Sequence, residues 1–304
     1  YPIGNSLFQQ ADIPKRLLPG AITLGAFTFT MTAFPGTPAI HNAIPMPYFG
    51  TDVFAAPVLG IISGLLMLFF GMLWLQKRQA EAKKNLEGYG DIAPHEQQEK
   101  QGETPSFLLS LLPLVAVVLI NYILLNWVIP QWQVDYLATP KFGETKLTKV
   151  MGMWALIGSL SVSVIMALIL FKKYLDKPLV SLNEGTFSSM LPILNTASEV
   201  GYGAVIASLS SFTLIKNSVI NIAPNAPLVG EAVAINILAG ITGSASGGLS
   251  IALDSLGDAF LALSQTHGIN PEILHRIASM ASGGFDSLPH NGSVITLLAI
   301  CGLT

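Results

Sequence analysis

Long stretches without charged residues are the feature that most constrains the fold of this chain. Residues 17–51, 54–76, 106–131 and 150–171 contain no Asp, Glu, Lys or Arg. Each stretch reaches the roughly 20 apolar residues that an α-helix needs to cross a bilayer. Charged residues make up 11% of the chain, against about 25% in soluble domains. The chain is therefore predicted to be an all-α polytopic membrane protein.

The alternation of apolar and polar segments predicts the individual crossings. The segments expected to form single spans are 54–76, 106–129, 150–171 and 185–215. Residues 17–51 are too long for one simple span, and prolines and a glycine interrupt them at 34–38. Residues 271–304 are interrupted in a similar way by Pro289 and Gly292. Both regions are predicted to be helices broken within the membrane.

The distribution of Lys and Arg predicts the orientation of the spans. If Lys15 and Arg16 lie inside, alternating spans place the charged segment 77–105 and Lys172 inside as well. The opposite side, which would include Arg276, then has fewer cations. Because short cytoplasmic loops are enriched in Lys and Arg, segment 77–105 is predicted to be a cytoplasmic linker.

Residues 240–248 form a run of Gly, Ser, Thr and small apolar residues between two apolar arms within 228–263. Each arm has about 15 residues and reaches roughly 22 Å as a helix, which is short of the hydrocarbon thickness. We therefore expect a re-entrant hairpin with its tip at 240–248. One long helix across the bilayer is the alternative.

The two ends of the chain resemble each other weakly. Residues 11–40 and 268–295 each contain a polar Pro hinge, a half-helix rich in small residues, a Pro/Gly break and an apolar segment. The predicted topology starts the two copies on opposite faces, so they would be inverted repeats. Inverted repeats with broken helices are typical of secondary transporters. The expected fold is thus an inverted-repeat, ion-transporter-like fold with re-entrant hairpins.

This fold divides the chain into three regions. Residues 1–76 would end a first repeat with a hairpin arm, a broken helix and a span, and 77–105 would be the linker. Residues 106–304 would form the second repeat, with three spans, the hairpin 228–263 and the broken helix 271–304. Because a partner for the first arm is missing and the chain begins with Tyr1, we expect a fragment of a longer protein.

The hairpin tip and the two breaks carry the candidate substrate site. Half-helix N-termini have free N–H groups and partial positive charge, which suit a carboxylate. Helix packing by small residues and a plain proline kink are the structural alternatives. The candidate substrate-binding residues are Pro35, Gly36, Thr37, Asn42, Thr242, Gly243, Ser244, Ser246, Gly247, Gly248, His290, Asn291 and Ser293.

Four ionisable residues within apolar segments are candidates for proton coupling. Asp286 and His290 are four residues apart and share one helix face. Glu199 and His41 are isolated in their segments, and a hydrogen-bonded structural role is the alternative for all four residues. His275, by contrast, is expected to be peripheral.

Other kinds of site find no support in the sequence. His, Cys, Asp and Glu do not cluster with metal-ligand spacing, so neither a metal nor another cofactor is expected. A net charge of −3 gives no reason to expect a nucleic-acid partner.

Several motifs together resemble the gluconate permease (GntP) family. They are Asp12-Ile13-Pro14-Lys15-Arg16, Pro35-Gly36-Thr37-Pro38, Ala197-Ser198-Glu199-Val200-Gly201-Tyr202-Gly203, the run 240–248 and Leu288-Pro289-His290-Asn291-Gly292. The resemblance covers nearly the whole chain, although members of that family are longer at both ends. It implies a multi-pass protein of the bacterial inner membrane that carries an organic anion, such as gluconate, by symport.

The residues and the resemblance together predict secondary active transport of a small hydroxylated carboxylate. Proton symport with alternating access is the expected mechanism, and sodium coupling stays open. The expected partners are the organic anion, the coupling ion and the lipid bilayer, with a homodimer left open. An intramembrane enzyme or a non-transporting membrane subunit is the alternative, although we expect no enzymatic activity.

Overall fold

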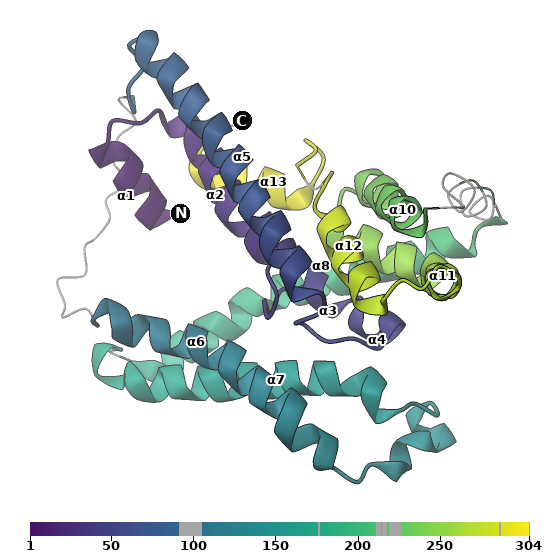
Figure 1. The fold of residues 1–304 in the computed structure, drawn as a ribbon. Coiled ribbons are helices and arrows are strands. Elements are labelled where there is room, and N and C mark those ends of the chain that lie inside the picture. Colours follow the sequence, from purple (N-terminus) through teal and green to yellow (C-terminus); the bar gives the residue numbers. More distant parts are fainter. Residues whose placement is uncertain are drawn as a thin grey trace.

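The computed structural model describes residues 1–90, 105–175, 177–210, 226–285 and 287–303, together with residues 214 and 218. These residues form helices and turns only, which confirms the all-helical prediction (Figure 1). The α-helices are α1 Pro2–Gln10, α2 Leu18–Ala26, α3 Ile40–Ala43, α4 Met46–Phe49, α5 Pro57–Lys84, α6 Phe107–Ile123, α7 Leu147–Leu170, α8 Pro178–Ser208, α10 Pro227–Thr242, α11 Ala245–Thr266, α12 Pro271–Ser282 and α13 Gly292–Cys301. Short π-helical or 3-10 segments occur at Lys15–Leu17, Phe29–Ala33, Leu124–Val128, Ile129–Gln131, Asp135–Ala138, Pro140–Phe142 and Lys172–Tyr174.

Among the described residues, three helical segments are long and apolar enough to cross a membrane. They are Pro57–Lys84, Phe107–Gln131 and Val150–Leu170, which agree with three of the predicted single spans. The fourth predicted span, 185–215, overlaps α8, a helix that contains Glu184 and is not among these three. The protein is thus a membrane protein with several candidate spans, while a crossing by α8 stays a prediction.

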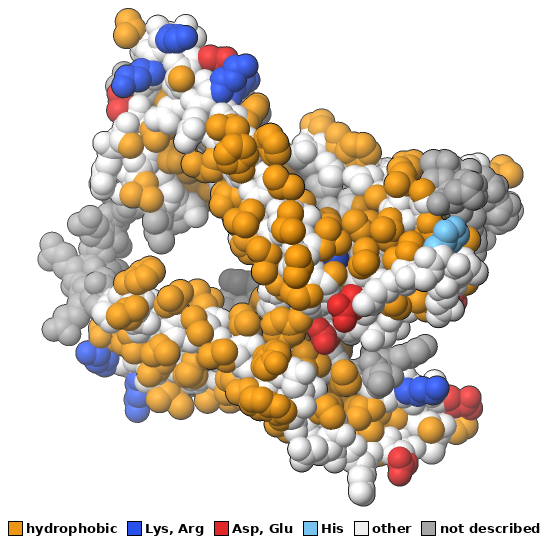
Figure 2. Space-filling view, viewed as in Figure 1, with side chains coloured by type: hydrophobic (Ala, Val, Ile, Leu, Met, Phe, Trp, Pro, Cys, Tyr) orange, Lys and Arg blue, Asp and Glu red, His pale blue; other side chains and the backbone are white. Residues whose placement is uncertain are grey.

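The exposed surface of α5 suits a lipid environment. Its outward-facing side chains are large and apolar, including Leu65, Phe69 and Phe70, each more than half exposed. Figure 2 shows this hydrophobic surface continuing along the helix, with Lys and Arg gathered at its end. This distribution is the one expected for a helix in hydrocarbon that ends in an aqueous interface.

The first predicted break in a helix is present, but the helices that follow it are shorter than expected. After α2 the chain forms a π-helical turn, Phe29–Ala33, and residues 34–39 are not helical. Instead of one apolar half-helix, two short helices follow, α3 and α4. Pro45 and Pro47 lie between and within them, and proline lacks the N–H that would continue a helix.

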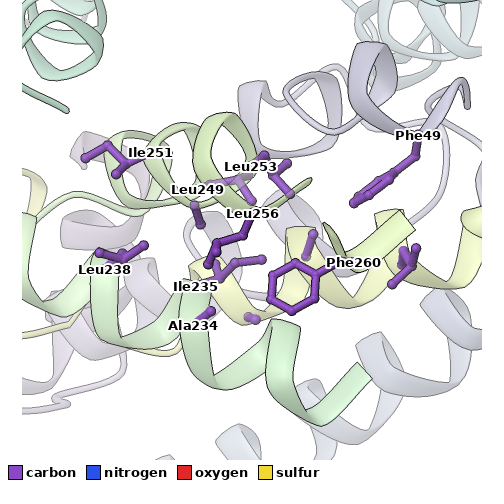
Figure 3. Close-up of a cluster of buried hydrophobic side chains, with 13 residues drawn as sticks. Phe49, Ala234, Ile235, Leu238, Leu249, Ile251, Leu253, Leu256 and Phe260 are labelled. Atoms are coloured by element: carbon purple, nitrogen blue, oxygen red, sulfur yellow. The ribbon is translucent and has the colours of Figure 1, made fainter. Parts of the chain in front are cut away.

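The predicted hairpin arms are observed as α10 and α11, which lie side by side and antiparallel (Figure 1). Together with α12 and Phe49 of α4 they enclose the largest apolar core of the described residues, which Figure 3 shows. The core residues are Phe49, Ala234, Ile235, Leu238, Leu249, Ile251, Ala252, Leu253, Leu256, Phe260, Leu274, Ala278 and Ala281. Whether the hairpin is re-entrant in the bilayer stays a prediction.

The two Pro-hinged copies begin at opposite ends of α5. At the C-terminal end of this helix, Arg16 Nε lies 2.5 Å from Glu87 Oε1, just before α2. At the N-terminal end, the backbone N–H of Ala56 donates to Glu272 Oε2 at 3.1 Å, at the start of α12. This arrangement is compatible with inverted repeats, and the repeat itself stays a prediction.

Candidate functional site

The hairpin tip is a tight turn between α10 and α11. Gly243 ends α10 in a left-handed conformation, with φ of +64°. Ser244 follows as the N-cap of α11, and its Oγ accepts from the N–H of Gly247 at 3.1 Å. A Cβ added at Gly248 would lie 2.2 Å from the Cα of Ala239. Gly248 therefore allows close contact of the two arms, which is the packing alternative for this residue.

The second break meets this tip. The side-chain amide of Asn291 donates from Nδ2 to the carbonyl of Gly243 at 2.9 Å. His290 Nε2 lies 2.8 Å from the carbonyl oxygen of Gly240. Because a carbonyl only accepts, this nitrogen of His290 must carry the hydrogen. Two polar residues of the break thus hold the end of α10.

Two helix N-termini are adjacent as a result. Asn291 caps α13, since its Oδ1 accepts from the N–H groups of Ser293 and Val294 at 2.8 and 3.1 Å. Ser244 caps α11 directly after Gly243, to which Asn291 is bonded. Each N-terminus carries roughly half a positive charge from the helix dipole. The junction is therefore electrostatically suited to an anion.

The side chains around the junction differ in exposure. His290 and Ser293 are exposed and Ser246 is partly exposed, whereas Ser244 and Asn291 are buried. Thr242 directs its hydroxyl to the carbonyl of Leu238 at 2.9 Å, so it caps its own helix. The accessible polar groups at the junction are thus contributed by both the tip and the break.

The first break lies in a different environment. The N–H of Gly36 donates to the carbonyl of Val53 at 2.8 Å, and an added Cβ would lie 2.8 Å from the ring of Phe54. Asn42 is fully buried and donates from Nδ2 to the carbonyls of Thr37 and Val53, both at 2.9 Å. Asn42 therefore stabilises the shape of this break.

Beside this break lies a buried polar cluster that the sequence reasoning missed. Arg276 of α12 is fully buried, and its guanidinium donates to the carbonyls of Ala55 and Val53 and to Asn42 Oδ1, at 2.8, 3.3 and 3.0 Å. Its neighbour His275 is also fully buried, with Nε2 at 3.1 Å from Asn42 Oδ1.

Two expectations are therefore wrong. His275 is central rather than peripheral, and Arg276 is no exposed cation that counts toward the orientation of the loops. Burial of Arg276 is compensated by backbone carbonyls of the 32–55 segment and by Asn42, and burial of His275 by the side chains of Thr51 and Asn42. The signal in the sequence was the polar face that His275, Ser279 and Ser282 form at helical spacing on α12.

Of the four proton-coupling candidates, the structure describes the side chains of His41 and His290, and these two lie at different sites. His41 is buried in α3, and its Nδ1 has no hydrogen-bond partner among the described residues. His290 lies at the hairpin junction. Asp286 lies outside the described residues, and so does the side chain of Glu199, whose backbone belongs to α8.

Comparison with known proteins gives one relative of high similarity. The chain is 39% identical over 318 aligned positions to "Uncharacterized transporter YxjC" of Bacillus subtilis (strain 168), and the match covers all of the chain and 67% of the relative. No family profile matches the chain. No solved structure matches it either. Identity at this level along the entire chain shows that the protein belongs to the same family as YxjC.

Proposed function

We propose that this protein is a secondary active transporter of a small hydroxylated carboxylate, such as gluconate or a related sugar acid, driven by the proton gradient. Membership in the family of YxjC, a protein named as a transporter, supports the transport function. The candidate spans support a location in the membrane. The resemblance of five motifs to gluconate permeases supports a sugar acid as substrate and the bacterial inner membrane as location.

The observation that carries the proposal is the junction of the hairpin tip with the second break. The hydrogen bond from Asn291 to Gly243 holds the N-termini of α11 and α13 next to each other. The partial positive charge of the two N-termini favours a carboxylate. The exposed Ser293 and the partly exposed Ser246 carry hydroxyl groups, which we expect to contact the hydroxyls of a sugar acid. A small molecule with one carboxylate and several hydroxyl groups would therefore suit this junction.

Alternating access requires parts that move relative to each other. The hairpin contacts the break mainly through side chains of the break, His290 and Asn291, bonded to backbone carbonyls of the tip. α12, in contrast, is tied to the 32–55 segment by the buried donors of Arg276. We infer that the hairpin moves relative to a unit formed by α12 and the first break.

Uptake by the full-length protein in proteoliposomes tests the function. Labelled gluconate and related sugar acids are offered with and without an inward proton gradient, and accumulation is expected with the gradient only. Absence of uptake of every sugar acid would exclude the substrate class. Uptake that depends on sodium and not on protons would exclude the coupling.

A matched pair of Asn variants tests the site. Asn291 and Asn270 each cap a helix through the side-chain oxygen Oδ1, and for Asn270 this cap accepts from the N–H of Glu272 at the exposed end of α12. Asn291 in addition donates from Nδ2 to the hairpin tip. N291D keeps the cap acceptor, loses this donor and adds negative charge beside the expected anion. It should weaken substrate affinity at least about tenfold, or 1.4 kcal/mol, whereas N270D should bind as the wild type does. Equal affinities of the two variants would place the anion elsewhere.

A further inference from the structure

A buried carboxyl group on α10 has no hydrogen-bond partner in the part of the chain that the structure describes. Glu231 is fully buried, and neither of its carboxyl oxygens has a hydrogen-bond partner among the described residues. It lies one helical turn before Ala234 and Ile235, on the face of α10 that packs against α11 and α12. Glu231 therefore projects toward the largest apolar core of the protein.

An ionised carboxylate is unfavourable in such a place. Removing an ion of this size from water costs several kcal/mol even after the protein relaxes, unless ion pairs or hydrogen bonds compensate. The buried side chains of Asn42 and Arg276, in contrast, have several hydrogen-bond partners each. Glu231 receives no such compensation from the described residues, so the neutral, protonated carboxyl is the form compatible with this conformation.

The charged groups on the two helices that pack against α10 do not compensate Glu231. On α11, Asp258 is exposed, and the exposed Asp254 accepts a hydrogen bond from Tyr48. On α12, the titratable and charged residues are Glu272, His275 and Arg276. Glu272 accepts from the N–H of Ala56, and the side chains of His275 and Arg276 bond to residues of the 32–55 segment.

A proton fits Glu231 better than a metal ion does. A bound sodium or other metal ion needs several oxygen ligands, and α10 is surrounded here by apolar side chains. Within the described part of the chain, no group of three or more His, Cys, Asp and Glu side chains is arranged to hold a metal. A proton needs one carboxyl oxygen only.

We propose that Glu231 is the residue that binds the coupling proton. This inference rests on the proposed proton-coupled transport and assigns the proton to a residue on the hairpin. In the conformation described here the carboxyl is neutral and closed off between α10, α11 and α12. When the hairpin moves away from α12, water reaches the carboxyl and accepts its proton.

Chemical labelling of the wild-type, full-length protein tests the protonation directly. Dicyclohexylcarbodiimide is an apolar reagent that reacts with protonated carboxyl groups in apolar surroundings, and mass spectrometry locates the modified residue. We expect modification of Glu231 that decreases as pH rises, and none at the exposed Asp258. Absence of modification at any pH would overturn the assignment, and so would protection of Glu231 by sodium at constant pH.

Transport by two variants tests the role in coupling. E231Q imitates the neutral carboxyl, so it should still exchange gluconate across the membrane but should no longer accumulate it when a pH gradient is applied. D258N removes an exposed carboxylate on the neighbouring arm and should accumulate gluconate as the wild type does. Accumulation by E231Q equal to that of the wild type would overturn the inference.

The two proposals fail in different ways. A wild-type protein that transports no sugar acid would overturn the proposed function, while the labelling experiment would still decide whether Glu231 is protonated. A wild-type protein that transports normally, with an unmodified Glu231, would leave the function intact and overturn this inference alone.

Discussion

Replacement of Arg276 by Met is the sharpest test of what holds α12 against the 32–55 segment. The guanidinium joins α12 to the 32–55 segment through carbonyls and through Asn42. Several of these acceptors would keep another donor in the variant. The carbonyl of Thr32 also accepts from Ser279, and the carbonyl of Val53 also accepts from Asn42. The carbonyl of Ala55 accepts from Arg276 twice, and the hydrogen bonds of the described residues show no other donor to it.

The expected loss of stability follows from the Ala55 carbonyl, which would lose its donor while the other acceptors keep theirs. One buried carbonyl without a donor costs about 1–3 kcal/mol, and hydrogen bonds to a charged group contribute about 1.5–3 kcal/mol net. Removing the buried charge recovers part of its desolvation cost. We therefore expect R276M to lower the free energy of unfolding by about 2–4 kcal/mol. R276K keeps the charge but has fewer donors in a different geometry, and should fall between R276M and the wild type.

Equilibrium unfolding of the full-length protein in mixed micelles measures these differences. R78M is the matched control, because Arg78 is exposed near the end of α5 and its ion pair with Glu81 is a surface pair. This control should change the free energy of unfolding by less than about 0.5 kcal/mol. If R276M unfolded as the wild type does, the reasoning that Arg276 joins α12 to the first break would be refuted.

Three further predictions concern close contacts and one exposed ion pair. G284A places a Cβ 1.9 Å from Asn236 Oδ1 and should lower the free energy of unfolding by about 1–3 kcal/mol, with partial recovery when Asn236 is also changed to Ala. G248A forces the hairpin arms apart, so uptake of gluconate should be lost while the protein still inserts into the membrane. The hydrogen bond from Arg16 lowers the pKa of the Glu87 carboxyl. This pair therefore stabilises the fold at pH values above the usual pKa of a Glu, and its contribution is lost as the pH falls through the lowered pKa. E87Q should remove that pH dependence in the unfolding measurement.

Matched controls separate these effects from general damage. G292A is the control for G284A, because an added Cβ at Gly292 meets nothing within 4 Å. For G248A the control is G185A on α8, which also meets nothing within 4 Å. Equal behaviour of a variant and its control would show that the contact in question contributes little.

The helices and their interruptions were accessible to sequence reasoning because each depends on neighbouring residues. Long runs without charge predicted α5 and the segments 107–131 and 150–170. The run of small residues at 240–248 predicted a hairpin tip, and Gly243 and Ser244 within it form the turn between α10 and α11. Short-range rules of hydropathy, proline geometry and capping are sufficient for features of this kind.

The contacts between segments were decided by the tertiary structure alone. The sequence suggested that both breaks face the hairpin tip, whereas Asn291 contacts the tip and Gly36 packs against Phe54. Arg276 and Glu231 are both fully buried, but among the described residues only Arg276 has hydrogen-bond partners. The physical reason is that the state of a buried charge depends on the groups that distant segments bring to it. Hydropathy along the chain places such a residue in the membrane, and the packing of the helices decides whether it stabilises the fold or can carry a proton.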